Sequence, residues 1–220
     1  MFIAAMRAVL RATEIWLQLV LLSFVCVAFV GVEDYQNGYW LFTIGCWFAL
    51  DLFWALAARQ TRPAMTGARN WRIHLVTIVI YALYCLPLSS IPLLGQRIIP
   101  NSAVLHGLGA VLCALGVGFA IWSRRVLSDS WSADVTRGEG HLLVQRGPYA
   151  LVRHPIYLGF LVAVVGMVLA LGEVRAFALL FGIEFLLKKM GQEESILRTA
   201  FPSEYPEYEQ RVKRLLPWIW

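Results

Sequence analysis

Charged residues are scarce in this chain, since lysine, arginine, aspartate and glutamate together make up only 15% of its 220 residues. That share is well below the average of soluble domains. The chain also lacks a long polar tract, which leaves no room for a separate soluble domain of ordinary size. Hydrophobic residues make up 59% of the sequence, and the mean hydropathy is +0.64. The composition therefore predicts an integral membrane protein with a single membrane domain over residues 1–220.

Cysteine is rare as well, and its positions carry no motif. The four cysteines lie in four different apolar runs, at spacings typical of neither zinc sites nor redox pairs. We therefore expect them to pack as small buried apolar side chains, and we expect no metal site.

Long apolar runs take the place of polar sequence. Four of them are long enough to cross about 30 Å of hydrocarbon as helices, near residues 15–32, 39–58, 73–94 and 104–122. Two shorter runs, 156–171 and 174–187, form either two short spans or one hairpin that dips into the bilayer. Because the runs are continuous rather than alternating, we predict an all-α polytopic membrane protein with about five to six membrane helices.

Basic residues are distributed unevenly between the predicted loops. All but two of the 19 lysines and arginines lie on one side, whereas Arg97 and Arg175 lie on the other. Since basic residues favour cytoplasmic loops, both termini and the loop before Pro155 are predicted to face the cytoplasm. The formal net charge of +5 follows from this asymmetry and suits nearby anionic lipid, so no nucleic-acid partner is expected.

Several residues within the apolar runs are unusual there. We expect Asp51 to form a hydrogen bond with another helix, and Glu184 to form a helical ion pair with Lys188 four residues later. Small residues recur every four positions in the fourth run, at Ala110, Ala114 and Gly118. That spacing would let a second helix, of this chain or another, approach closely.

Residues 140–159 gather charge and aromatic rings at the start of an apolar run. Proline is well tolerated in the first turn of a helix, so Pro155 predicts that His154 lies at or near the N-cap. The free N–H groups and positive dipole end of such a helix suit a carboxylate or a phosphate. Gly147 and Pro148 predict a tight turn that returns Tyr149 to the same place.

A second polar region covers residues 188–214. In a helix, Lys189 and Glu193 share a face, whereas Glu194 points about 100° away. We therefore expect only one of the two glutamates to face a given site. The last dozen residues are typical of an amphipathic helix at the membrane surface, with two tryptophans at the interface.

Together these two regions are similar to a known family. GPYALVRHPIYLG (147–159) and EESILRTAFPSEYPEYEQRVKRLLP (193–217) resemble the C-terminal half of the isoprenylcysteine carboxyl methyltransferases, which are related to the phospholipid N-methyltransferases. RHPxYxG joined to EExxL and Tyr-x-x-Tyr is a specific combination. The resemblance implies S-adenosylmethionine-dependent methyl transfer at the cytoplasmic membrane face. It further implies that residues 123–220 form the catalytic half, while the apolar runs of residues 1–122 predict four transmembrane helices there.

The resemblance also implies which residues hold the cofactor. They are His141, Leu142, Leu143, Val144, Tyr149, His154, Pro155, Ile156, Tyr157 and Glu193. A carboxylate such as Glu193 can bind the methionine ammonium, and His154 or nearby backbone donors can bind the methionine carboxylate. The rings of Tyr149 or Tyr157 can face the sulfonium, and the leucines offer the adenine an apolar wall.

The acceptor is expected to be lipophilic: a prenylcysteine-like carboxylate, or another lipid-like molecule that enters from the bilayer. A carboxylate is already ionised at neutral pH, so the site must mainly place it and exclude water. Arg153 is the first choice for the cation that positions it, and Lys189 is the second. Lys189 stands where the eukaryotic members have an arginine, and lysine cannot form a bidentate contact. An amine acceptor therefore stays open; it would need a base, for which Glu194 is predicted.

Other functions fit the same residues. The chain could be a phospholipid N-methyltransferase, or an NADPH-dependent reductase like the membrane sterol reductases, whose C-terminal half is broadly similar. A third alternative is a membrane scaffold without activity, in which His154 and the arginines only anchor the chain at the interface.

Overall fold

The computed structural model describes residues 38–60, 91–127, 143–174, 176–177 and 181–217. The predicted run 15–32 and most of the run 73–94 lie outside these residues, as do His141 and Leu142. The described elements are helices α2 (Gly38–Gln60), α4 (Ala103–Leu127), α5 (Pro155–Leu171), α6 (Phe181–Ala200) and α7 (Glu204–Arg211), with a short 3-10 helix η2 (Gly147–Ala150). In this part of the chain the only β contacts are two isolated bridges, so the predicted all-α class is confirmed.

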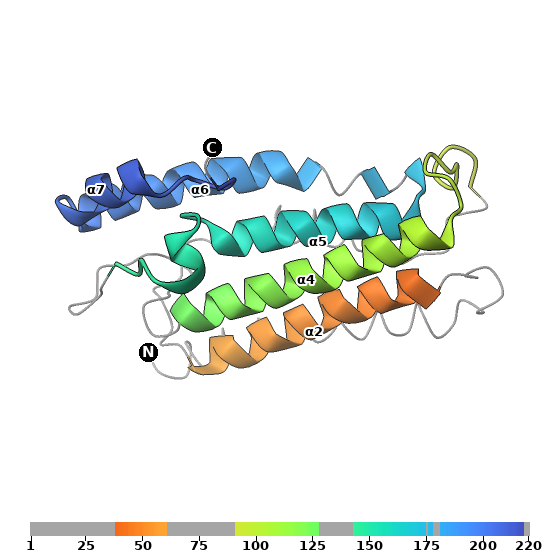
Figure 1. The fold of residues 1–220 in the computed structure, drawn as a ribbon, viewed down its shortest axis with the longest axis horizontal. Coiled ribbons are helices and arrows are strands. Elements are labelled where there is room, and N and C mark those ends of the chain that lie inside the picture. Colours follow the sequence, from red (N-terminus) through yellow and green to blue (C-terminus); the bar gives the residue numbers. More distant parts are fainter. Residues whose placement is uncertain (1–37, 61–90, 128–142, 175, 178–180, 218–220) are drawn as a thin grey trace, which may run out of the picture.

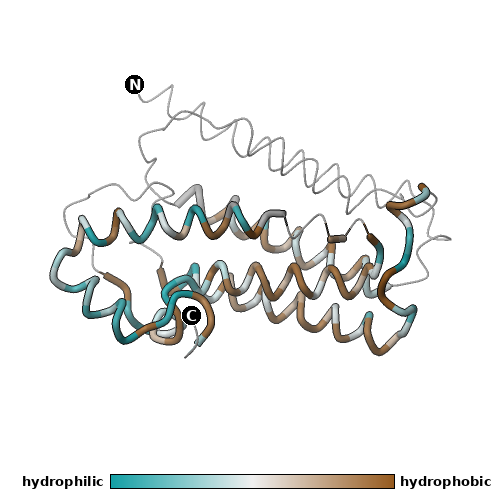
Figure 2. Tube along the Cα trace, turned by 90° about the horizontal axis from the view of Figure 1, so that it is seen from above, coloured by the Kyte–Doolittle hydropathy of each residue, from teal (hydrophilic) through white to brown (hydrophobic). Residues whose placement is uncertain are grey.

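The long helices lie roughly along one direction (Figure 1). Helices α2, α4 and α5 lie side by side, and α6 returns along the bundle to end beside α7. Of the described helices, α4 is the one long and apolar enough to cross a membrane, while α5 is a shorter apolar helix of 17 residues. Hydrophobic residues cover most of α4 and α5, whereas hydrophilic ones gather on α7 and the adjoining part of α6 (Figure 2).

Four glycines allow α4 and α5 to pack backbone against backbone. A Cβ added at Gly109 would lie 2.6 Å from the Gly166 carbonyl oxygen, and one added at Gly159 would lie 2.7 Å from the Gly116 carbonyl oxygen. No side chain fits at such distances, so glycine is required on both helices. Among the described residues, nothing lies within 4 Å of a Cβ added at Gly118, so the described contact between α4 and α5 does not pass through the far end of the predicted row.

The start of α5 agrees with the prediction. Pro155 occupies the first turn and His154 is the N-cap residue. The helix ends at Gly172, whose φ of 72° is the left-handed conformation that glycine adopts most readily. Helix α6 is described from Phe181 to Ala200, and its second half carries the polar residues that follow the last apolar run. Early in α6 the predicted ion pair is confirmed, with Lys188 Nζ 2.6 Å from Glu184 Oε1.

Candidate functional site

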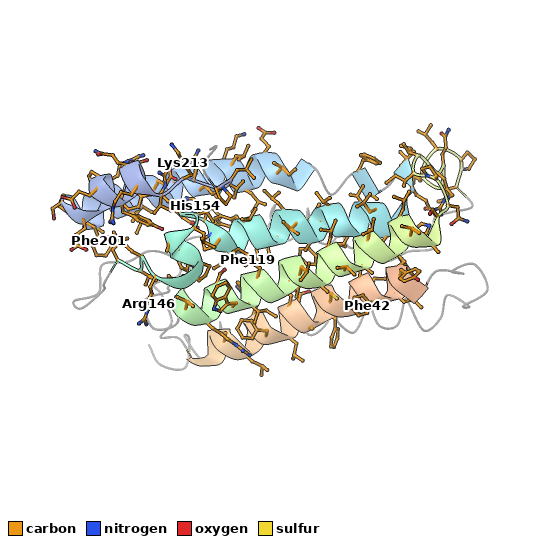
Figure 3. The ribbon with its side chains drawn as sticks, in the orientation of Figure 1. Phe42, Phe119, Arg146, His154, Phe201 and Lys213 are labelled. Atoms are coloured by element: carbon orange, nitrogen blue, oxygen red, sulfur yellow. The ribbon has the colours of Figure 1, made fainter. Side chains whose placement is uncertain are left out.

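Most of the described polar residues singled out in the sequence meet at one end of the bundle, where α5 begins and α6 ends. His154 lies there at the start of α5, below α6 and close to Lys213 of the C-terminal segment (Figure 3). Three chain segments far apart in sequence therefore contribute to this end: residues 147–157, the second half of α6, and residues 204–215.

Glu194 is the centre of a buried ion-pair cluster. Its side chain is only 5% exposed, and Oε1 accepts hydrogen bonds from Arg153 Nη2 (3.0 Å), His154 Nε2 (3.1 Å) and Arg214 Nε (3.1 Å). Arg214 Nη2 lies 2.9 Å from Oε2. One carboxylate thus joins α6, the loop before α5 and the C-terminal segment.

Glu193 approaches the same histidine from another side. Tyr157 donates a hydrogen bond of 2.6 Å to Glu193 Oε1, and His154 Nδ1 lies 3.8 Å from Glu193 Oε2. Both glutamates therefore face His154, contrary to the expectation that only one of them could. The reason is that the imidazole presents a nitrogen on each side of the ring, so two adjacent positions of α6 can each reach one.

The orientation of His154 follows from these contacts. Its ring stacks on Tyr157, with the centroids 5.6 Å apart and the planes at 29°. An ionised carboxylate can only accept hydrogen bonds. His154 Nε2 is therefore the protonated ring nitrogen, and it donates the hydrogen bond to Glu194. Glu193 is 28% exposed at the side chain, far more than Glu194, so it is the carboxylate that a small molecule can reach.

The C-terminal segment does not continue as a helix. Residues 212–215, which we call the strap, are not helical and lie along the loop that precedes α5, where Lys213 forms an isolated bridge with Val152. Arg153 N donates to the Lys213 carbonyl (2.8 Å), and His154 N donates to the Arg214 carbonyl (3.1 Å). The expectation of a surface helix over the last dozen residues was therefore wrong for the strap, because its backbone groups pair with a distant loop.

Arg153 has all its guanidinium nitrogens engaged. Besides the contacts with Glu194, Nη1 donates to the carbonyl of Glu209 (3.0 Å) and to that of Val212 (3.1 Å), and Nη2 lies 3.3 Å from Glu209 Oε1. The side chain is 10% exposed. In this structure, then, Arg153 joins the loop before α5 to α6, α7 and the strap.

Tyr149 is buried in the short helix η2, where Gly147 (φ 60°) and Pro148 form the predicted turn. Tyr208 of α7 donates a hydrogen bond of 2.7 Å to the Tyr149 carbonyl. Burial raises the pKa of the Tyr149 phenol, although the positive charge of nearby Arg124 opposes the shift. The phenol therefore stays neutral at physiological pH.

The remaining predicted residues are placed less centrally. Leu143, Val144 and Ile156 are half-buried, Pro155 is buried, and Lys189 is exposed on α6. Two further arginines lie at this end of the bundle and were not predicted to belong to the site. Arg124 is 3% exposed in the last turn of α4 beside Tyr149, and Arg214 holds Glu194. A basic residue at the end of an apolar helix is usually a surface anchor, so the sequence did not indicate that Arg124 is buried beside the site.

We expect the buried cluster to make the protein sensitive to acid. Burial acts to raise the pKa of Glu194, but hydrogen bonds and charge from His154 and Arg153 lower it to about 2 from an ordinary value of 4.5. A carboxyl with a depressed pKa stabilises the fold above its unfolded pKa and loses that contribution as pH falls through the folded value. Thermal unfolding between pH 6 and pH 2 should show midpoints that fall below about pH 4.5, and less steeply in Glu194→Gln.

Comparisons with known proteins relate the chain to methyltransferases. A model of the phospholipid methyltransferase family matches residues 104–204. A Schizosaccharomyces pombe protein-S-isoprenylcysteine O-methyltransferase is 36% identical over 86 residues, which cover 38% of this chain and 36% of that protein. Methanethiol S-methyltransferase 1 of Bradyrhizobium diazoefficiens is 42% identical over 70 residues, covering 32% of this chain and 24% of that protein.

A solved structure has the same fold. It is that of a eukaryotic intramembrane Ras methyltransferase, isoprenylcysteine carboxyl methyltransferase, with a TM-score of 0.56 at 20% identity, covering 81% of this chain and 68% of that one. The matched stretches span well under half of the length of the two curated relatives. The predicted resemblance is confirmed as a similarity: residues 104–204 match the phospholipid methyltransferase family, part of the chain is similar to isoprenylcysteine O-methyltransferases, and the chain has the fold of the solved isoprenylcysteine carboxyl methyltransferase.

Proposed function

We propose that this chain is an S-adenosylmethionine-dependent methyltransferase that acts at the cytoplasmic face of a membrane on the carboxylate of a lipophilic, prenylcysteine-like acceptor. The observation that carries the proposal is the meeting of His154, Tyr157 and Glu193 at the start of α5, within the region that matches the methyltransferase families. The proposal includes the multi-pass topology with both termini in the cytoplasm, four helices in residues 1–122 and the catalytic half in residues 123–220.

The residues present suit the cofactor. Glu193 is an accessible carboxylate that is oriented by the Tyr157 hydroxyl, which leaves it able to bind an ammonium group. His154 and the first turn of α5 offer donors to a carboxylate. The aromatic faces of Tyr149 and Tyr157 suit a sulfonium, and the apolar side chains of Leu142, Leu143 and Val144 suit an adenine; His141 and Ile156 are proposed to bind the cofactor as the resemblance implies. When bound, S-adenosylmethionine supplies an activated methyl group.

The protein's own contribution is then to position the acceptor against the cofactor and to exclude water. A carboxylate acceptor needs no base, because it is ionised at neutral pH. We propose that Arg153 and Glu194 act by holding His154, since their charges are engaged with each other and with the strap. Lys189, exposed on α6 one turn before Glu193, is then the cation proposed to meet the acceptor.

A second acceptor class has support from one relative. Methanethiol S-methyltransferase 1 of Bradyrhizobium diazoefficiens acts by its name on a thiol, which must lose a proton, as an amine must. Glu194 is a weak base for that purpose, because its pKa is held near 2 by His154 and Arg153 against the effect of burial. This favours the carboxylate acceptor for this chain.

Glu193→Gln tests the proposal. The amide keeps the shape of the side chain but loses the charge that would bind the cofactor ammonium. A hydrogen bond to a charged group contributes about 1.5–3 kcal/mol, so we expect S-adenosylmethionine to bind roughly 10- to 100-fold more weakly. Calorimetric titration of the purified full chain measures this.

The matched control is Glu184→Gln, the same change at an exposed position on the same helix. It should bind the cofactor as the original chain does. Equal affinity of Glu193→Gln and the original chain would refute the assigned role of Glu193. An original chain that binds no S-adenosylmethionine, and methylates neither a prenylcysteine analogue nor an aminophospholipid, would refute the proposed function.

A further inference from the structure

The strap acts on His154 through one residue, Arg214, which uses both its backbone carbonyl and its side chain. The carbonyl of Arg214 accepts the hydrogen bond from His154 N at 3.1 Å. The guanidinium of Arg214 holds both oxygens of Glu194, with Nε 3.1 Å from Oε1 and Nη2 2.9 Å from Oε2. Since Glu194 Oε1 accepts from His154 Nε2, Arg214 acts on the backbone directly and on the ring through Glu194.

The end of the strap is anchored in apolar packing. Leu215 is 5% exposed and forms a buried cluster with Tyr157 and Met190. On α6, a Cβ added at Gly191 would lie 3.5 Å from Arg214 Nη2, which is an ordinary van der Waals distance, so the guanidinium lies against α6 at Gly191.

We propose that Arg214 is a positioning residue for the cofactor site, which fixes the ring of His154 through Glu194 and the backbone of His154 through its own carbonyl. This inference rests on the proposed function. Both contacts lead to His154, so the effect of Arg214 reaches the cofactor site through His154. With Oε2 held by Arg214, Oε1 stays directed at Nε2, and Nδ1 stays on the side of Glu193.

A positioning role and a merely structural role have different kinetic signatures. If Arg214 positions His154, its loss weakens cofactor binding in every molecule, so KM for S-adenosylmethionine rises and kcat changes little. If Arg214 only stabilises the fold, its loss lowers the fraction of active molecules, so kcat falls and KM stays the same.

The experiment compares Arg214→Ala and Arg214→Lys with the original chain, using calorimetric binding of S-adenosylmethionine and initial rates on a prenylcysteine analogue. We expect Arg214→Ala to raise the dissociation constant and KM roughly tenfold, with kcat within about twofold. Arg214→Lys keeps the charge but not the two-point contact. Its dissociation constant and KM should therefore lie between those of the original chain and those of Arg214→Ala. Should the alanine variant fail to fold, the lysine variant carries the same expectation of a raised KM.

Arg211→Ala is the matched control, because Arg211 is an exposed arginine three residues earlier whose Nη2 donates to Gln145. It should behave as the original chain does. Unchanged cofactor affinity in both Arg214 variants, or a loss of kcat at constant KM, would overturn the inference while leaving the proposed function intact. An original chain without cofactor binding would overturn both.

Discussion

Glu194→Ala should abolish measurable S-adenosylmethionine binding and strongly destabilise the protein. The substitution leaves Arg153, His154 and Arg214 facing one another without the carboxylate that now joins them. Removing one partner of a buried ion pair costs about 3–5 kcal/mol, because the remaining charge stays buried and uncompensated. Binding is lost for the separate reason that His154 loses the contact that orients its ring.

Two further variants test this explanation. Glu194→Gln keeps the volume and one acceptor oxygen, so it should retain more stability than Glu194→Ala. Glu207→Ala removes a carboxylate from an exposed position on α7 and should change neither property. Thermal unfolding and calorimetric binding on the purified full chain give both readouts. Cofactor affinity in Glu194→Ala equal to that of the original chain would show that the cluster plays no part in the site.

Gly116→Ala should be the second most damaging change. The added methyl group would meet the Ala163 nitrogen, would lie 2.5 Å from the Gly159 carbonyl oxygen, and would lie 2.9 Å from the Ala163 Cα. These are backbone atoms, so α4 and α5 must separate along their contact. Overpacking of this kind costs about 1–3 kcal/mol, and more where the backbone must move.

The control is built into the same helix. Gly118 lies two residues on, is exposed, and has no atom of the described residues within 4 Å of an added Cβ. Gly118→Ala should leave stability unchanged or raise it by up to about 1 kcal/mol, since alanine is the better helix former. Thermal unfolding of both glycine variants in the same detergent gives the comparison. For a chain of this size the unfolding midpoint shifts by roughly 2–4 °C for each kcal/mol of unfolding free energy. Equal midpoints would show that α4 and α5 do not pack through Gly116.

Local sequence signals predicted the site best where a single residue determines the backbone conformation. Pro155 cannot occupy the interior of a helix without cost but fits the first turn, so the start of α5 and the position of His154 were readable. The turn at Gly147 followed for the same kind of reason. The spacing of Glu184 and Lys188 likewise identified an ion pair within one helix.

Contacts between distant segments were not readable. The strap pairs with a loop about sixty residues earlier through backbone groups, which carry no side-chain signal. The convergence of both glutamates on His154 depends on where α6 lies relative to α5, which a helical wheel does not contain. The contact between α4 and α5 was not readable either, because it passes through glycines seven residues apart, at 109 and 116, and a spacing of four does not select them.

The central claim is that the end of the bundle around His154 and Glu193 binds S-adenosylmethionine. Its most direct test is a pair of calorimetric titrations of the purified full chain, one with S-adenosylmethionine and one with NADPH, repeated with Glu193→Gln. We predict saturable heat from S-adenosylmethionine that weakens in the variant, and no heat from NADPH. Saturable heat from NADPH with none from S-adenosylmethionine would contradict the account and assign the site to a reductase.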